Sequence, residues 1–281
     1  MLKSSDPSLK DDLNHRGETN GPTSSTSHKD ASFSSDLFQI LWINENRHFW
    51  FHHRCDLIAW ALKRYFADAR SFLEIGCGNG FVLEYLEARL PSISFWGAEL
   101  FADGLAYARK RLARTTLIQM DIFESPLKAD FDVIGLLDVI EHLDDDESAL
   151  KRAFDHIKPG GGAIITVPQH PSLWSEKDIG AFHKRRYTKS GLRNLLEKTG
   201  FTILRITSFI SFLMPALIIS RKFQTGSRHD DLFDEFSIPP VLNAICGKVC
   251  KLEGFFIKKG LSMPFGGSLM AIVKKPERRH H

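Results

Sequence analysis

The chain has 281 residues, which is enough for one or two domains and for a full hydrophobic core. Its 37 basic and 34 acidic residues leave a net charge of +3, and this near balance gives no support for a nucleic-acid partner. The four cysteines form no C-x-x-C pair and no disulfide-like framework, so we expect a cytoplasmic protein with reduced thiols.

The first 32 residues predict a disordered tail. They are rich in Ser, Asp, Asn and Gly, and such a composition buries too little apolar surface to offset the entropy of ordering. They also lack the basic start and sustained apolar run of a secretory signal. The next segment, 33–67, is helical in pattern and dense in aromatic side chains, so we expect an N-terminal helical cap.

A core segment, 68–208, alternates short apolar runs with amphipathic stretches. The expected strands are SFLEIG, ISFWGAE, TTLIQM, FDVIGLL, AIITVP and TILRITSF, and SLMAIVKK forms a seventh within the final segment, 263–275. The helix DGLAYARKRLA is expected to be capped by Asp103, and DESALKRAFDHI to be closed by KPGGG. Strands alternating with helices predict βαβ units, and therefore an α/β fold with a parallel sheet and helices on both faces.

The segment 209–262 is an apolar and basic insert that we expect to be helical. The stretch ITSFISFLMPALIIS at its start has 15 residues and no charge, which is short of the roughly 20 residues that cross a bilayer. We expect a buried helix or a hydrophobic lid. The alternative is an interfacial element, because cations that would suit an anionic membrane surface follow: Arg221, Lys222, Lys248, Lys251, Lys258 and Lys259.

The stretch LEIGCGNG places Gly76, Gly78 and Gly80 directly behind a predicted strand, where a ligand could approach the bare backbone. A nucleoside triphosphate loop would continue with Lys and then Ser or Thr, and this one does not. A dinucleotide loop would have its third glycine at position 81, which is Phe81. Both spacings therefore argue against a phosphate-binding loop.

Acids at three successive strand ends point to a different cofactor. Glu74 would repel a pyrophosphate and suits a positively charged group, while Glu99 could accept hydrogen bonds from ribose hydroxyls. Asp121 could accept from an adenine amino group, with Ile122 against the ring. An amine, a ribose and an adenine without phosphates describe S-adenosylmethionine.

In order and spacing, LEIGCGNG, GAEL, MDIF, FDVIGLLDVIEHL and KPGGGAIITVP resemble the motifs of class I S-adenosylmethionine-dependent methyltransferases. The resemblance is nearest to the branch of the ubiquinone-biosynthesis O-methyltransferases. It implies a Rossmann-like, mostly parallel sheet of seven strands whose last strand is antiparallel. From their own composition, we expect the aromatic first helix and the apolar insert to form an inserted helical cap over the pocket. The resemblance further implies a set of cofactor contacts, in which Arg54 would meet the methionine carboxylate: Trp50, Arg54, Glu74, Gly76, Cys77, Gly78, Glu99, Leu100, Asp121, Ile122 and Leu137.

Two clusters are candidates for the chemistry. In DVIEHL, His142 is the expected general base for an oxygen acceptor, and Glu141 would orient it or bind the acceptor. The resemblance associates a similar cluster with a divalent cation, and the corresponding residues here are Asp138, Glu141 and His142. Adjacent side chains should point apart, so we expect no metal. The long loop containing HKRRYT is suited to an anionic or phenolic acceptor through Trp174, His183, Arg186 and Tyr187, of which His183 and Tyr187 are also expected to be catalytic.

We therefore expect an S-adenosylmethionine-dependent methyltransferase that methylates an oxygen of a small or lipid-like hydroxylated acceptor. An N- or C-methyltransferase stays open, because the cofactor motifs do not touch the acceptor. A non-catalytic cofactor-binding protein is a second alternative. A nicotinamide oxidoreductase is disfavoured by the glycine spacing and by Glu74.

Overall fold

A computed structural model describes residues 35–223 and 238–277, which belong to one compact unit, 33–281. The predicted tail, 1–32, lies outside the described residues. Among the described helices, none has the length and apolar character needed to cross a membrane.

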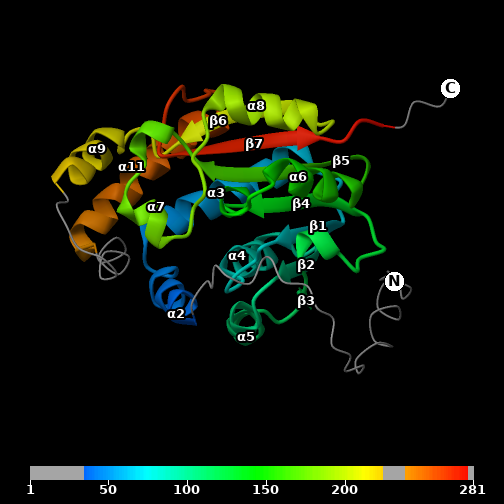
Figure 1. Cartoon of the computed structure of the whole chain (residues 1–281). Helices are drawn as coiled ribbons and strands as arrows, with labels where there is room; N and C mark the ends of the chain where they lie inside the picture. Colours follow the sequence, from blue (N-terminus) through cyan, green and yellow to red (C-terminus); the bar gives the residue numbers. More distant parts are fainter. Residues whose placement is uncertain (1–34, 224–237, 278–281) are drawn as a thin grey trace. The chain divides into compact units, whose positions relative to one another are not determined.

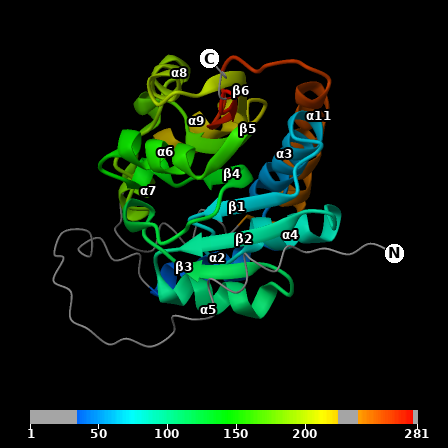
Figure 2. The same cartoon turned by 90° about the vertical axis from the view of Figure 1, so that its right-hand side faces the viewer.

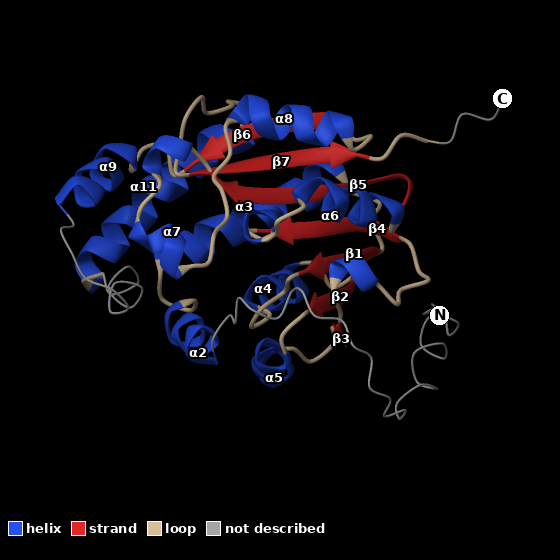
Figure 3. Ribbon diagram, viewed as in Figure 1, coloured by secondary structure: helices blue, strands red, loops and turns tan. Residues whose placement is uncertain are grey.

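A seven-stranded sheet in the order β3-β2-β1-β4-β5-β7-β6 organises this unit (Figure 3). Strand β7 is antiparallel to its two neighbours, and the other pairs are parallel. The fold therefore confirms the predicted mostly parallel, Rossmann-like sheet. The strands are β1 Ser71–Ile75, β2 Ser94–Glu99, β3 Thr116–Gln119, β4 Phe131–Leu137, β5 Ile157–Pro168, β6 Thr202–Phe209 and β7 Ser268–Lys274.

Helices cover both faces of the sheet, because the strands carry apolar side chains on each side (Figure 2). One core lies under α3 (Phe49–Tyr65), α4 (Phe81–Arg89) and α11 (Pro240–Lys258), and the other under α6 (Asp146–Asp155) and α8 (Lys189–Lys198). Helix α5 (Ala102–Arg111) packs on β2 and β3.

The carboxyl ends of the six parallel strands meet at one side of the sheet, which we call the carboxyl edge. The strand order reverses between β1 and β4, and open α/β sheets bind ligands outside such a point. Three further helices gather at this edge (Figure 1): α2 (Ser35–Asn44), α7 (Glu176–Gly180) and α9 (Met214–Phe223). Three short 3-10 turns also lie there: η1 (Ile122–Glu124), η2 (Ile140–His142) and η3 (Pro171–Leu173).

The structure corrects two local predictions. Strand β5 begins at Ile157, so KPGGG is part of a strand; a Cβ on Gly162 would lie 2.2 Å from the carbonyl oxygen of Val273, so this glycine allows β7 to pair closely. Helix α5 is capped by the backbone of Phe101 without a side-chain hydrogen bond, and Asp103 lies in its first turn instead of at the cap. The helical pattern of 33–67 is divided into α2 and α3.

The insert is anchored to the carboxyl edge by one buried acid. Glu253 of α11 is 1% exposed and accepts hydrogen bonds from the backbone N–H groups of Ile210, Ser211 and Phe212, directly after β6. Its carboxylate also lies 3.3 Å from the ring of His53 on α3. The stretch 206–220 is thus divided between the end of β6, a turn and α9, and does not form one buried helix.

Candidate active site

The loop between β1 and α4 exposes its backbone to the carboxyl edge. Gly76, Gly78 and Gly80 have φ values of +71°, +52° and +75°, which side chains adopt only with strain. The amide groups of Gly76 and Cys77 both donate to the carbonyl of Ala98, which holds the loop against β2. A Cβ on Gly78 would meet no atom of the described chain within 4 Å, so the loop is open at this residue.

Two buried acids flank this opening. Glu99 accepts hydrogen bonds from the amides of Gly78 at 2.8 Å and Phe101 at 3.1 Å, and so ties the end of β2 to the glycine loop. Glu74 is 3% exposed, and its Oε2 atom has no hydrogen-bond partner within the described part of the chain. Burial raises the pKa of Glu74 to about 8, although the nearby Arg54 opposes the shift. An unsatisfied acid at this place suits a cationic ligand group.

The remaining predicted cofactor residues line the same edge. Asp121 accepts from the amide of Phe123 at 2.9 Å and starts η1, while Ile122 is buried behind it. Cys77 and Leu137 are buried, and Leu100 is 41% exposed beside Glu99. The four strand ends that carry these residues are neighbours in the sheet.

Arg54 lies at the point where the strand order reverses. Its guanidinium stacks at 4.5 Å from the centre of the Trp50 ring and forms an ion pair with Asp138, which follows β4. Asp138 has a φ of +58° and also accepts from the hydroxyl of Thr166 at 3.1 Å. With 9% exposure Arg54 is not a solvated surface charge, and its Nε atom has no partner among the described residues.

The turn η2 presents a buried acid beside two histidines. Glu141 is 0% exposed, its carboxyl oxygens have no hydrogen-bond partner in the described chain, and burial raises its pKa well above the usual range. Burial, together with the neighbouring His183, lowers the pKa of His142 to about 4. One ligand atom from each of Glu141, His142 and His183 lies within 4.8 Å of the others, an arrangement that could hold a metal ion. The sequence had offered Asp138 for this set, in the place that His183 takes.

Asp178 organises the loop that supplies His183. It is 1% exposed and accepts from His183 Nδ1 at 2.9 Å and from Arg186 Nε at 2.6 Å. Although burial opposes it, these hydrogen bonds lower the pKa of Asp178 to about 2. Because the carboxylate accepts from Nδ1, the Nε2 atom of His183 is left as the basic nitrogen.

This loop docks on η2 and brings the two predicted clusters together. The amide of Lys184 donates to the carbonyl of Glu141 at 2.7 Å, and the two imidazole rings, of His142 and His183, lie 4.9 Å apart. The hydroxyl of Tyr187 donates to Asp146 at 2.7 Å, and burial raises its pKa further above the ordinary value. The geometry thus favours a structural role for Tyr187 over the catalytic one predicted.

The residues predicted to bind the acceptor differ in their surroundings. Arg186 is held by Asp178 and by the carbonyl of Gln169, so it stabilises the loop, whereas Trp174 is 42% exposed. Asp178 was not among the predicted site residues. Its only signal was the Ser-x-x-Asp capping box that starts α7, and that spacing does not indicate a contact with His183.

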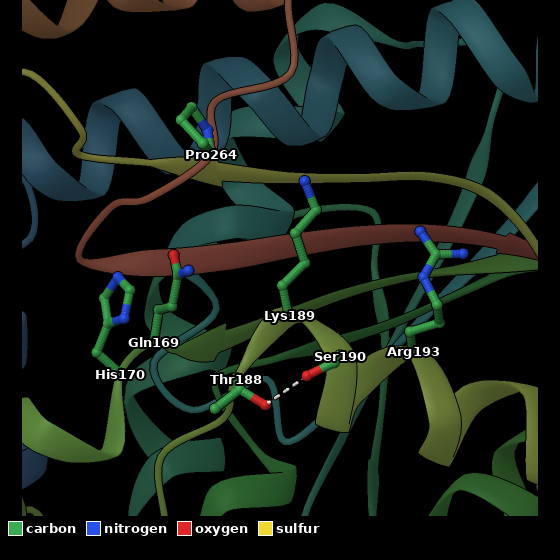
Figure 4. A pocket seen from close by; sticks show the side chains of 7 residues that line it. All are labelled: Gln169, His170, Thr188, Lys189, Ser190, Arg193 and Pro264. Atoms are coloured by element: carbon green, nitrogen blue, oxygen red, sulfur yellow. Dashed lines mark hydrogen bonds between the residues drawn. The ribbon is translucent and has the colours of Figure 1, made fainter.

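A separate hollow of about 470 Å³ lies beside the start of α8 (Figure 4). Thr188 caps this helix by accepting from the amide of Gly191 at 2.9 Å. The hollow contains none of the predicted cofactor or acceptor residues. Its lining is formed by Gln169, His170, Thr188, Lys189, Ser190, Arg193 and Pro264.

The curated proteins that are similar to this chain include the following three. The chain is 28% identical over 137 residues to the "Probable S-adenosylmethionine-dependent methyltransferase" of Mycolicibacterium smegmatis, covering 48% of this chain and 52% of that protein. It is 24% identical over 131 residues to the ubiquinone biosynthesis O-methyltransferase of Pseudomonas fluorescens (44% and 56%). It is 29% identical over 126 residues to the dTDP-3-amino-3,4,6-trideoxy-alpha-D-glucopyranose N,N-dimethyltransferase of Streptomyces venezuelae (42% and 51%). The chain spans about half the length of these relatives.

A family model described as a methyltransferase domain matches residues 44–206, which is more than half of the chain. Among solved structures, the plantazolicin methyltransferase BpumL in complex with SAH superposes with a TM-score of 0.57 over 89% of this chain and 92% of that one. The identity is 18%, so this likeness shows the fold alone.

Proposed function

The chain belongs to the S-adenosylmethionine-dependent methyltransferases, and from this premise we propose that it methylates a hydroxyl oxygen of a small or lipid-like acceptor. The observation that carries the proposal is the His183–Asp178 pair, which lies beside Glu141 at the carboxyl end of β4. A histidine held in this way is a general base of the kind that an oxygen nucleophile requires.

The residues at the glycine loop fit the cofactor. The unsatisfied oxygen of Glu74 would accept from its ammonium group, and Glu99 would accept from the ribose hydroxyls, since each carboxylate oxygen has a second lone pair. Asp121 and Ile122 would hold the adenine, and Arg54, stacked on Trp50, would meet the carboxylate. When bound, S-adenosylmethionine supplies a methyl group that is already activated for transfer.

In the proposed mechanism, His183 Nε2 would take the proton of the acceptor hydroxyl as the oxygen accepts the methyl group, and the cofactor would leave as S-adenosylhomocysteine. The ionised Asp178 stabilises the resulting imidazolium through Nδ1, and Arg186 balances the charge of Asp178. Burial lowers the pKa of His142 to about 4, which disfavours a proton on its ring, so His142 is not the proposed base. Glu141, kept protonated by burial, would orient the acceptor by a hydrogen bond.

A second candidate is N-methylation. The observation in its favour is the buried, unsatisfied carboxyl group of Glu141, which would also accept from an amine. An ammonium acceptor would first have to lose a proton, so the two candidates use the same base.

We also propose that the protein works in the cytoplasm on an apolar acceptor. The four cysteines are free thiols, which suits a reducing compartment. Exposed apolar side chains of α9, such as Ile218 and Ile219, follow the carboxyl end of β6 and would accommodate a lipid-like chain.

The test is methyl transfer from labelled cofactor by the full chain to matched acceptors, a phenol and an aniline, each with and without a long alkyl chain. We expect transfer to the alkyl phenol to exceed transfer to the others. Binding of S-adenosylhomocysteine, measured by calorimetry with NAD as the control, shows independently that the cofactor site is intact. Transfer to anilines alone would replace the O-methylation proposal with the second candidate, and binding without transfer to any acceptor would indicate a cofactor-binding protein.

A further inference from the structure

The outward side of α11 is apolar and basic. The helix packs on the core through Cys250, Gly254 and Ile257, together with the buried Glu253. Its opposite side exposes Val241 (74%) and Leu252 (53%) among other large apolar side chains. We call this set the α11 face: Val241, Leu242, Ile245, Leu252, Phe255 and Phe256, with Lys248, Lys251, Lys258 and Lys259 beside them.

The α11 face is a continuous stripe and is not a set of scattered residues. Positions 241, 245, 252 and 256 repeat at helical spacing and therefore share one side of the helix. The stripe continues onto a neighbouring loop, because the ring of the exposed Phe212 lies 6.3 Å from that of Phe256. The one acid in the α11 sequence, Glu253, is buried, so its outward charges are all positive.

We propose that the α11 face docks on the surface of an anionic phospholipid bilayer, with the helix lying in the plane of the interface. Apolar side chains on an exposed helix would enter the boundary between head groups and acyl chains, and lysines beside them would meet lipid phosphates. Lysine side chains suit this position, because the apolar stem can lie along the membrane while the ammonium stays in water.

Charge favours a membrane over a second copy of this chain. A two-fold interface places the same surface on both sides, so it would bring the lysines of one α11 face towards those of the other. The face offers no exposed acid to neutralise them. An anionic lipid surface supplies the opposite charge over a wide area and needs no complementary shape.

Docking would place the membrane beside the candidate active site. Glu253 joins α11 to the backbone of residues 210–212 at the carboxyl edge, and α9 follows from the same edge (Figure 1). A lipid-like acceptor could then reach the site without crossing water. This last step rests on the proposed function, whereas the docking itself requires no methyl transfer.

The experiment is co-sedimentation of the full chain with phosphatidylcholine vesicles, with and without phosphatidylglycerol. We expect binding to the anionic vesicles, with the partition coefficient reduced about 25-fold in Lys248→Gln/Lys251→Gln, since each lysine near the surface contributes roughly fivefold. We expect the partition coefficient of Leu252→Ser/Phe256→Ser to be at least about tenfold lower than that of the wild type. Matched controls are Lys110→Gln/Lys128→Gln and Leu204→Ser, whose side chains are also exposed but do not belong to the α11 face, and these should bind like the wild type.

Four outcomes would overturn the proposal. Wild type that ignores anionic vesicles, or α11 variants that bind as well as the controls, would remove the membrane as the partner. A dimer in solution that the α11 variants break would assign the face to a second copy. Four acids lie in a segment outside the described residues: Asp230, Asp231, Asp234 and Glu235. If the vesicles bind only a variant in which these acids are neutralised, the α11 face would be assigned to that segment of the same chain. Binding of S-adenosylhomocysteine by each variant verifies its fold. If the wild type also fails to bind this ligand, the proposed function is wrong, and the vesicle result still decides the docking proposal.

Discussion

The two halves of the carboxyl edge are built on different principles. At β1, β2 and β3 the predicted ligand contacts come from backbone and from single acids at strand ends, such as Glu74 and Glu99. At β4 and β5 they come from side chains of segments that are far apart in sequence, joined by Asp178 and by the docking of Lys184 on Glu141. The first half is local and repeats a strand–turn pattern, whereas the second depends on how a long loop folds back.

The largest expected effect is in the second half. His183→Ala should lower turnover by about 10³-fold, within the usual range for loss of a general base, while S-adenosylhomocysteine binding stays unchanged. His142→Ala is the matched control, because its ring lies 4.9 Å away, and its loss should be smaller. Equal losses in the two variants would remove the distinction between the histidines. The measurement is single-turnover transfer with the preferred acceptor.

The next effect is in the first half of the carboxyl edge, where the cofactor is expected to bind. Glu99→Ala should weaken S-adenosylhomocysteine binding by about 1.5–3 kcal/mol, because the carboxylate joins the glycine loop to the ribose position. Turnover at saturating cofactor should change little. Glu99→Gln keeps one acceptor oxygen, so its affinity for S-adenosylhomocysteine should lie between those of the wild type and Glu99→Ala. Isothermal calorimetry gives the affinity, and unchanged affinity in both variants would remove Glu99 from the cofactor site.

A pH profile tests Glu74. Its folded-state pKa of about 8 lies above its ordinary value of 4.5, so its contribution to stability is full below pH 4.5 and is lost as the pH rises through 8. As the pH rises through 8, the carboxylate of the folded protein ionises and can accept a hydrogen bond from the ligand ammonium. The affinity for S-adenosylhomocysteine should therefore rise by up to about tenfold between pH 7 and 8.5. Glu74→Gln should have a flat profile, and a wild-type profile that is equally flat would contradict the assignment.

The last comparison concerns the stability of the loop and two of its glycines. Gly78→Ala should cost about 1–2 kcal/mol of unfolding free energy, from backbone strain at φ +52° alone, because its Cβ would meet open space. Gly76→Ala should cost more, since its Cβ would lie 2.6 Å from a methyl carbon of Val139. Urea denaturation of both variants measures the difference. Equal costs would show that Val139 moves aside.

The sequence predicted most of the cofactor half. Glycines with positive φ, and acids at the ends of β1, β2 and β3, are each specified within a few residues of a strand, so the strand pattern places them. The KPGGG segment was a harder case: glycines and a proline usually interrupt a strand, and only the close pairing with β7 explains why they lie within one.

In the acceptor half, the sequence indicated the candidate residues but not the contacts between them. Tyr187 was predicted to be catalytic because it lies in HKRRYT, yet in space its hydroxyl meets Asp146. The outward side of α11 was likewise present in the sequence, but a helix shows which side is exposed only when its packing on α3 is known.

The amino-acid sequence by itself therefore determined the sheet, the glycine loop and the acids that suit a phosphate-free adenosine cofactor, because local periodicity and strand ends specify them. The tertiary structure decided which histidine is held by Asp178, where Arg54 points and which side of α11 faces outward. These depend on contacts between residues that are distant along the chain, and such contacts leave no spacing in the sequence from which they could be predicted.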